Sequence, residues 1–143
     1  MEIYKGIKDF ITNVATLGFK FDALINNGAL GCDFGEKIPT SQLAKDTLEI
    51  NVVGTIQLTD GILPLLKDTG RVINVSSKLA ALRFQAKEIA EKFNNTNLSI
   101  EEINLAIEKY IEGCNKKDLE GFYQSVYGTS KMMLNAWSRF ILA

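Results

Sequence analysis

The pattern of apolar positions predicts an amphipathic helix over residues 2–17. Apolar side chains recur there at steps of three and four residues, so they gather on one side of a helix. These positions are Ile3, Ile7, Phe10, Ile11 and Val14. Gly18 is predicted to end the helix, because glycine readily adopts the left-handed conformation that closes many helices.

Two short apolar runs, at residues 21–26 and 70–77, predict strands of a parallel sheet that are buried on both faces. In the second run the polar residues gather at the C-terminal end. The sequence between the runs predicts a long helix over 40–66, with a break near Gly61 and Pro64. A strand, a helix and a second strand in this order form a βαβ unit, in which the two strands are parallel.

From about residue 79 to 122 the chain is more charged and rich in asparagine, and its periodicity predicts helices over 82–93 and 100–113. Ser99 and Glu102 fit a capping box, in which both side chains bond to backbone N–H groups at the start of a helix. We therefore expect a helical insertion between the second strand and the last helix of the chain.

Composition indicates a single globular domain over residues 1–143. The chain is 46% hydrophobic and has a formal net charge of -1, so it can bury a core. Its 16 basic and 17 acidic residues are interspersed, which argues against a nucleic-acid partner. No apolar run reaches the roughly 18 residues of a membrane span, so we expect no membrane association and a cytoplasmic location.

The chain contains no histidine, which removes the commonest zinc ligand and general base. We therefore predict no metal site. Cys32 and Cys114 lie far apart in the sequence and are expected to be reduced thiols.

Candidate chemistry lies in the last predicted helix, over residues 125–143. Tyr127 and Lys131 are four residues apart, so both side chains project from one side of that helix. An ammonium group close to a phenol favours the phenolate, which would make Tyr127 a usable proton donor or acceptor near neutral pH. Tyr4 and Lys8 have the same spacing, but no strand that ends in serine precedes them, so we do not interpret this pair as a site.

Polar residues follow both predicted strands, where ligands bind in open α/β sheets because loops and helix N-termini converge there. Asn27, Gly28 and Ala29 follow the first strand, Ser77 ends the second, and Asn51 lies between them in the long helix. Each of these residues alone has an ordinary structural interpretation as part of a turn, a cap or a helix. Their order along the chain carries the functional signal.

This order resembles the short-chain dehydrogenase/reductase superfamily. The matching features are the Asn-Asn-Gly-Ala strand end, Asn51, the Val-Ile-Asn-Val-Ser-Ser strand and the Tyr-Gly-Thr-Ser-Lys helix. The helical insertion makes the chain most similar to the monomeric carbonyl reductases, which implies a monomer. The resemblance covers the middle and catalytic part of the family pattern. It implies an α/β fold, a partial Rossmann-like doubly wound parallel sheet with a helical insertion before the Tyr-Lys helix.

The resemblance implies a role for each matched residue. Tyr127 would protonate the carbonyl oxygen of the substrate, and Ser77 would hydrogen-bond that oxygen and stabilise its developing charge. Lys131 would assist Tyr127 and bind the nicotinamide ribose, and Asn51 would connect Lys131 to a proton relay through a bound water. Ser77 is preferred to Ser76 because neighbouring strand residues point to opposite faces, and the family's catalytic serine aligns with the second.

The implied cofactor is NADPH, and the implied reaction is the reduction of aldehydes, ketones or quinones to alcohols by hydride transfer. The cofactor side of the site would be formed by Asn27, Gly28 and Ala29, together with Tyr127 and Lys131.

Two features depart from the family pattern. The sequence has no Thr-Gly-x-x-x-Gly-x-Gly turn to bind the pyrophosphate, and the strand end reads Asn-Asn-Gly-Ala in place of Asn-Asn-Ala-Gly. The flanking strands of a complete sheet are also absent, so we expect an unpaired edge and uncovered apolar surface that promote association. The resemblance therefore implies two alternatives. We expect a carbonyl reductase-like enzyme, active or inactive in this truncated form, or a non-catalytic binding or regulatory protein that retains the reductase core.

Overall fold

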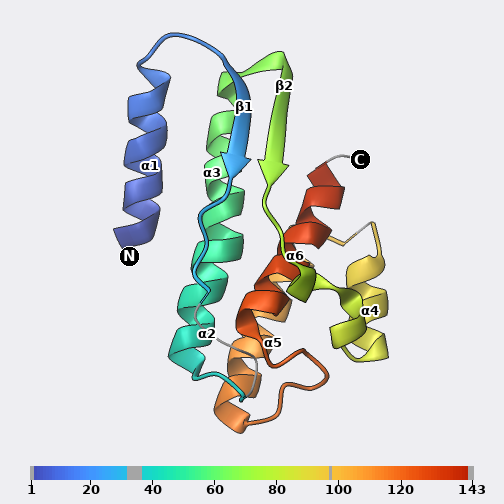
Figure 1. Cartoon of the computed structure of the whole chain (residues 1–143). Coiled ribbons are helices and arrows are strands. Elements are labelled where there is room, and N and C mark those ends of the chain that lie inside the picture. Colours follow the sequence, from blue (N-terminus) through green and yellow to red (C-terminus); the bar gives the residue numbers. More distant parts are fainter. Residues whose placement is uncertain (1, 32–36, 97, 142–143) are drawn as a thin grey trace.

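A parallel pair of strands and a layer of helices make up the structure, a computed structural model that describes residues 2–31, 37–96 and 98–141 (Figure 1). The elements are α1 (Glu2–Ala15), β1 (Phe21–Asn26), α2 (Ser41–Leu48), a π-helical segment (Glu49–Gly54), α3 (Thr55–Ile62), β2 (Leu66–Asn74), α4 (Lys87–Asn94), α5 (Ile100–Lys116) and α6 (Val126–Ile141). Short 3₁₀ turns lie at Leu63–Leu65, Lys78–Ala80 and Leu82–Phe84. The α/β class predicted from the sequence is confirmed.

β1 and β2 run parallel, as the βαβ pattern predicts. Ala23 lies opposite Arg71, and the register continues to Asn26 opposite Asn74. The carboxyl ends of both strands therefore lie at the same end of the sheet, and the polar residues that follow each strand gather there.

The bounds of β2 differ from the prediction at both ends. The strand begins at Leu66, earlier than predicted, and it ends at Asn74 rather than at Ser77. It ends early because Ser77 caps the following 3₁₀ turn, and the Ser77 Oγ accepts a hydrogen bond from the N–H of Leu79 at 3.2 Å.

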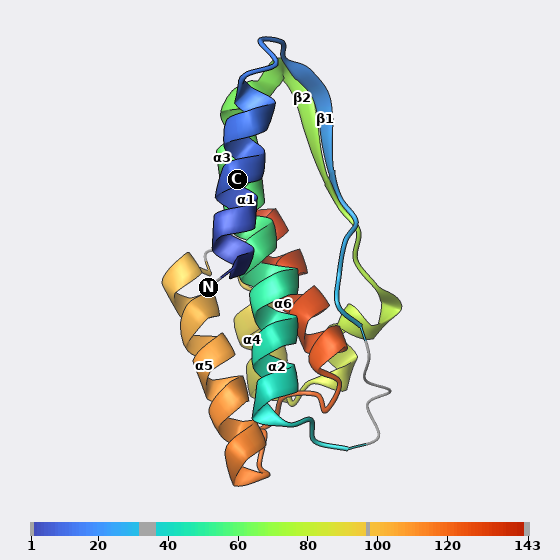
Figure 2. The same ribbon diagram turned by 90° about the vertical axis from the view of Figure 1, so that its left-hand side faces the viewer.

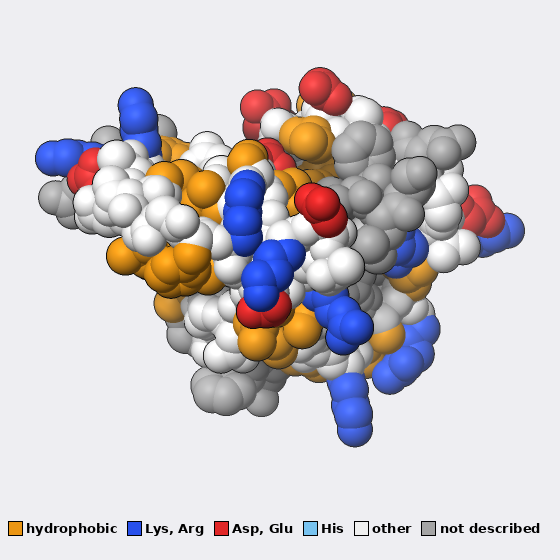
Figure 3. All heavy atoms as spheres, turned by 90° about the horizontal axis from the view of Figure 1, so that it is seen from above, with side chains coloured by type: hydrophobic (Ala, Val, Ile, Leu, Met, Phe, Trp, Pro, Cys, Tyr) orange, Lys and Arg blue, Asp and Glu red, His pale blue; other side chains and the backbone are white. Residues whose placement is uncertain are grey.

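The helices cover one face of the sheet and leave the other uncovered (Figure 2). The exposed fractions of Ile25, Ile73 and Val75 are 61%, 45% and 39%. The prediction of strands buried on both faces is wrong for the described part of the chain, because no described residue covers the second face. On the face shown in Figure 3, hydrophobic side chains lie exposed between charged side chains of both signs.

α2, the π-helical segment Glu49–Gly54 and α3 form one continuous helix. The Oγ1 of Thr40 caps its first turn by accepting a hydrogen bond from the N–H of Leu43 at 3.2 Å. The α-helical part ends at Ile62 and Pro64 lies in the 3₁₀ turn that follows, so the predicted break at this end is confirmed. The sequence pattern does not predict the π-helical segment, because its apolar positions also fit an ordinary helix.

α1 packs against α3 through part of the stripe that the sequence predicts. The half-buried positions of this stripe are Ile7, Ile11 and Val14. Phe10, by contrast, is 53% exposed, and the side chain of Ile3 lies outside the described residues. The helix ends at Ala15, and Gly18 adopts a left-handed φ of 71° in the turn that follows.

The insertion over residues 79–122 is helical, as predicted. α4 begins at Lys87, later than predicted, because two 3₁₀ turns precede it. α5 begins with the predicted capping box, in which the Ser99 Oγ accepts from the N–H of Glu102 at 3.2 Å and the Glu102 Oε2 accepts from the N–H of Ser99 at 3.0 Å. α5 extends to Lys116, beyond its predicted end.

The main core lies between the helices. Its largest fully buried aromatic side chains come from the insertion and from α6, and they are Phe93, Tyr110 and Trp137. Cys114 is a buried free thiol, as expected, and burial raises its pKa. The prediction for Cys32 lies outside the described residues.

Candidate functional site

A polar network joins four elements at the carboxyl ends of the strands. The Asn26 Nδ2 donates to the Thr59 Oγ1 at 2.9 Å and to the Asn74 Oδ1 at 2.7 Å. The Asn74 Nδ2 donates in turn to the Ser138 Oγ at 2.8 Å. These hydrogen bonds connect β1 to α3, β2 and α6. The sequence prediction missed this network, although the asparagines that end two apolar strands were a detectable signal.

Asn51 joins the segment after β1 to α6. Its side chain is 1% exposed and lies in the π-helical segment. The Oδ1 accepts from the N–H of Leu30 at 2.8 Å, while the Nδ2 donates to the Leu30 carbonyl at 2.8 Å and to the Ser130 Oγ at 2.9 Å. The Ser130 Oγ donates to the Tyr127 carbonyl at 2.7 Å. Asn51 is therefore connected to the Tyr127 turn by hydrogen bonds, and its role in a water relay stays a prediction.

Lys131 joins α6 to the end of β2. Its side chain is 2% exposed, and the Nζ donates to the carbonyl of Val75 at 2.7 Å. The Nζ lies 5.8 Å from the centre of the Tyr127 ring. Burial lowers the pKa of Lys131, because the charged form loses solvation.

The buried position of Lys131 predicts a pH dependence of stability. Because its pKa is lower in the folded chain than the ordinary value of 10.5, the unfolded chain binds more protons between these two values. The free energy of unfolding of the wild type is therefore expected to rise relative to that of Lys131→Met as the pH increases towards 10.5. Urea unfolding at a series of pH values measures this difference.

Lys116 provides the control for this prediction. Its Nζ lies 2.7 Å from the Glu112 Oε1, and that hydrogen bond raises the pKa of Lys116. The stabilisation from Lys116 is therefore fully present below pH 10.5 and is lost only above it, so the stability difference between the wild type and Lys116→Met is expected to stay nearly constant as the pH increases towards 10.5. A difference for Lys131→Met that does not change with pH would contradict the prediction.

The Tyr127 ring lies in a hollow at the end of the sheet. The ring is half-buried and packs on Gly31, where an added Cβ would lie 2.9 Å from the Tyr127 Cδ2. The hollow has a volume of about 410 Å³, and Asn27, Ala29 and Leu79 also line it. Tyr127 therefore shares this hollow with residues predicted to form the cofactor side of the site.

Ser77 lies in the segment that crosses the first turn of α6. Ser77 caps the 3₁₀ turn that contains Leu79, and a Cβ added at Gly128 would lie 2.8 Å from the Leu79 carbonyl oxygen. The segment after β2 is thus packed next to Tyr127. The Oγ of the neighbouring Ser76 is buried and has no hydrogen-bond partner among the described residues.

The Asn27-Gly28-Ala29 segment is exposed at the same end of the sheet. Gly28 does not have a positive φ, and a Cβ added there would meet nothing within 4 Å. Ala29, which stands where the family pattern has glycine, does not have a positive φ either, so the order Gly-Ala in place of Ala-Gly creates no backbone strain at this turn. The Asn27-Gly28-Ala29 segment beside the Tyr127 ring is open to a ligand, and its predicted role on the cofactor side of the site stays a prediction. The sequence contains no Thr-Gly-x-x-x-Gly-x-Gly turn, the pattern that binds a dinucleotide pyrophosphate.

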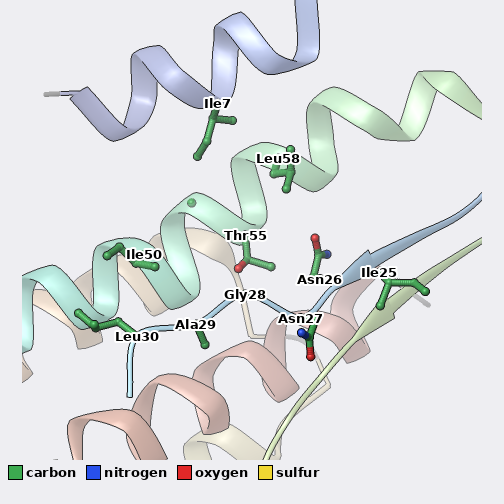
Figure 4. Close-up of a pocket in the computed structure, with 11 residues that line it drawn as sticks. Ile7, Ile25, Asn26, Asn27, Gly28, Ala29, Leu30, Ile50, Thr55 and Leu58 are labelled. Atoms are coloured by element: carbon green, nitrogen blue, oxygen red, sulfur yellow. The ribbon is translucent and has the colours of Figure 1, made fainter. Parts of the chain in front are cut away.

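A second cavity, of about 460 Å³, lies between α1, the long helix and the segment after β1 (Figure 4). Its lining is mainly aliphatic and includes Ile7, Ile50 and Leu58, together with the polar residues Asn26 and Thr55. Among the residues that the structure describes, no group of histidine, cysteine and acidic side chains could hold a metal ion. A search of the same residues finds no helix that is long and apolar enough to span a membrane.

The sequence of this chain matches a known protein family. Residues 1–89 match the family model described as short chain dehydrogenase. The chain is 32% identical over 122 residues to carbonyl reductase (NADPH) 1 of Homo sapiens, and the match covers 82% of this chain and 44% of that protein. It is 33% identical over 124 residues to the protein of the same name from Sus scrofa, covering 82% and 42%. The chain therefore spans less than half the length of these relatives.

Two solved structures share the fold. Salutaridine reductase from Papaver somniferum superposes with a TM-score of 0.79 at 24% identity, covering 94% of this chain and 60% of that one. Menthone neomenthol reductase from Mentha piperita gives a TM-score of 0.78 at 23% identity, covering 94% and 61%. These matches confirm the partial Rossmann-like fold. The match over residues 1–89 and the 32% identity to the Homo sapiens protein establish that the chain belongs to the short chain dehydrogenase family.

Proposed function

We propose that this chain carries the carbonyl-reducing side of an NADPH-dependent reductase site that acts on aldehydes, ketones or quinones. The main support is the hollow in which the Tyr127 ring lies beside Asn27, Ala29 and Leu79. A carbonyl group in this hollow would contact the phenol of Tyr127 on one side. On the other sides it would contact Asn27 and Ala29, which follow β1, and Leu79, which follows β2. The names of the relatives from Homo sapiens and Sus scrofa, which are carbonyl reductases that use NADPH, suggest the cofactor and the reaction class.

Each predicted site residue has a task in this proposal. Tyr127 donates its hydroxyl proton to the carbonyl oxygen, and Ser77 hydrogen-bonds the same oxygen as negative charge develops on it. Lys131, whose Nζ is held by the Val75 carbonyl, has further N–H donors that bind ribose hydroxyls. Asn51 acts as a positioning residue, because its contacts with Leu30 and Ser130 hold the walls of the hollow together.

The cofactor would bind through Asn27, the backbone of Gly28 and Ala29, Tyr127 and Lys131, and when bound it supplies the hydride. The chain itself supplies the proton and the orientation of the carbonyl group. Since the sequence has no Thr-Gly-x-x-x-Gly-x-Gly turn to bind the pyrophosphate, we expect these residues to bind NADPH more weakly than a site that includes such a turn.

A second proposal is a non-catalytic binding or regulatory protein that retains the reductase core. It is favoured by the missing phosphate turn and by the uncovered face of the sheet, where Ile25 and Ile73 are exposed. In this case the residues of the Tyr127 hollow would keep a structural role only.

Titration of NADPH against the purified chain separates the two proposals. The enzyme proposal predicts a saturable change in nicotinamide fluorescence and oxidation of NADPH when a small quinone such as 2-methyl-1,4-naphthoquinone is added. A folded chain, shown by circular dichroism, that neither binds NADPH nor oxidises it would contradict the enzyme proposal and support the binding protein.

A further inference from the structure

The hydroxyl of Tyr110 connects the insertion to the segment that precedes α6. Tyr110 lies on α5, and its side chain is buried. Its Oη lies 3.1 Å from the Tyr123 carbonyl oxygen and 3.0 Å from the Gln124 carbonyl oxygen, so one O–H group is shared between two backbone acceptors. The ring packs edge-on against Phe122, with 5.6 Å between the ring centres, so the core fixes the position of the hydroxyl.

The connecting segment between α5 and α6, residues 117–125, has an irregular backbone that depends on such contacts. Glu120 has a φ of 50° and Gly121 a φ of 94°, and a positive φ is costly for a residue with a side chain. The start of the insertion supplies two further hydrogen bonds here. The N–H of Tyr123 donates to the Gln85 Oε1 at 2.9 Å, and the N–H of Ala86 donates to the Gly121 carbonyl at 2.8 Å. Contacts within the insertion therefore hold the connecting segment in one conformation.

Tyr127 depends on the connecting segment because it lies in the first turn of α6. The first N–H groups of a helix have no partner within the helix, and helix ends open more readily than helix centres. Ser125 ends the connecting segment and holds this turn. The N–H of Gly128 donates to the Ser125 Oγ at 3.0 Å, and the N–H of Thr129 donates to the Ser125 carbonyl at 2.9 Å. A shift of the connecting segment would therefore move the Tyr127 ring in its hollow.

Thr129 adds a direct bond between α6 and the same segment. Its buried Oγ1 donates at 3.2 Å to the Tyr123 carbonyl, which also accepts from Tyr110. Thr129 lies between Tyr127 and Lys131 on α6. One backbone carbonyl therefore accepts hydrogen bonds from α5 and from the helix that carries two of the predicted site residues.

We propose that Tyr110 is a positioning residue for the reductase reaction. Its hydroxyl holds the connecting segment and thereby keeps the Tyr127 hydroxyl at the distance from the substrate carbonyl that proton transfer requires. This inference rests on the proposed function, in which Tyr127 is the proton donor. A reacting group displaced by about 1 Å costs about 100-fold in rate, so even a small shift of this turn has a measurable effect.

Tyr110→Phe tests the inference, because it removes the hydroxyl and keeps the ring that packs on Phe122. With NADPH and 2-methyl-1,4-naphthoquinone, we expect kcat to fall about tenfold, while KM for the quinone and Kd for NADPH change by less than about threefold. The solvent deuterium isotope effect on kcat is expected to increase, since a displaced proton donor makes proton transfer a slower step. A smaller fraction of folded chain would lower kcat and leave this isotope effect unchanged.

Hydrogen exchange measured by NMR reports how firmly the turn is held, without NADPH. In Tyr110→Phe, the amide protons of Gly128 and Thr129, which bond to Ser125, are expected to exchange at least about threefold faster. The amide proton of Ile107, in the centre of α5, is expected to keep its exchange rate within about twofold.

Ile103→Val is the matched control on the same helix. Ile103 is buried on α5, so the loss of one methylene destabilises the insertion without removing a hydrogen bond to the connecting segment. We expect kcat and the isotope effect of this variant to stay within about twofold of the wild-type values. An equal fall of kcat in both variants would overturn the inference, because the insertion would then act through its stability alone.

The two readouts separate this inference from the proposed function. An active wild type together with a Tyr110→Phe protein that keeps the wild-type kcat would overturn the inference and leave the proposed function standing. A folded wild type that does not oxidise NADPH would contradict the proposed function. In that case the exchange rates of Gly128 and Thr129 would still decide whether the Tyr110 hydroxyl holds the Tyr127 turn, and unchanged rates would overturn the inference.

Discussion

Replacement of Tyr127 by phenylalanine is expected to lower the rate of quinone reduction at least about 100-fold, the usual range for loss of a general acid. Phenylalanine keeps the ring that packs on Gly31 and lines the hollow, so the local structure is preserved. The substitution removes only the hydroxyl, to which the proposed function assigns the proton transfer. The affinity for NADPH is expected to change by less than about threefold, and the oxidation of NADPH in the presence of quinone measures the rate.

Tyr4→Phe is the matched control for this prediction. Tyr4 and Lys8 have the same spacing as Tyr127 and Lys131, but they lie on α1. Burial, followed by the nearby charge of Glu49, raises the pKa of Tyr4, so it is a poorer proton donor than an ordinary tyrosine. Its loss is expected to leave the rate unchanged within about twofold. A Tyr127→Phe protein that keeps the wild-type rate would show that another group protonates the substrate.

The order of the elements could be predicted from the sequence because it depends on local patterns. Apolar runs of strand length predict β1 and β2, and the capping residues Thr40 and Ser99 set the starts of two helices. The burial of the strands could not be predicted in the same way. A run such as Phe21–Asn26 has the composition of a strand covered on both faces, but the described chain covers only one of them.

The candidate site was predictable where its spacing is local, and less so where it depends on tertiary contacts. Tyr127 and Lys131 lie on one helix, so a spacing of four residues is enough to place them together. The bond of Lys131 to the Val75 carbonyl depends on how α6 packs against β2, which no local pattern encodes. The hydrogen bonds of Asn51 with Leu30 likewise depend on tertiary packing, because they join the π-helical segment to the segment after β1.

Replacement of Asn51 by alanine is expected to lower the free energy of unfolding by about 2–4 kcal/mol, because three hydrogen bonds are lost and no small side chain can restore them. The N–H and C=O of Leu30 would both lose their partner, and the Ser130 Oγ would lose a donor. Urea unfolding measures the loss. Asn104→Ala provides the control, because Asn104 lies on the exposed face of α5, and its loss is expected to cost less than about 0.5 kcal/mol.

Asn51→Asp tests whether Asn51 stabilises the chain through its hydrogen bonds or only through its packing. A carboxylate nearly preserves the volume of the side chain and can still accept from the N–H of Leu30, but it cannot donate to the Leu30 carbonyl. Because Asn51 is 1% exposed, an aspartate there would also lose solvation, and its pKa in the folded chain would be raised. The variant is therefore expected to be destabilised at neutral pH and to recover part of its stability as the pH falls and the carboxyl group is protonated, since the protonated acid can again donate. Stability of Asn51→Asp that does not depend on pH, or equal to that of the wild type, would show that Asn51 contributes through its shape and not through its hydrogen bonds.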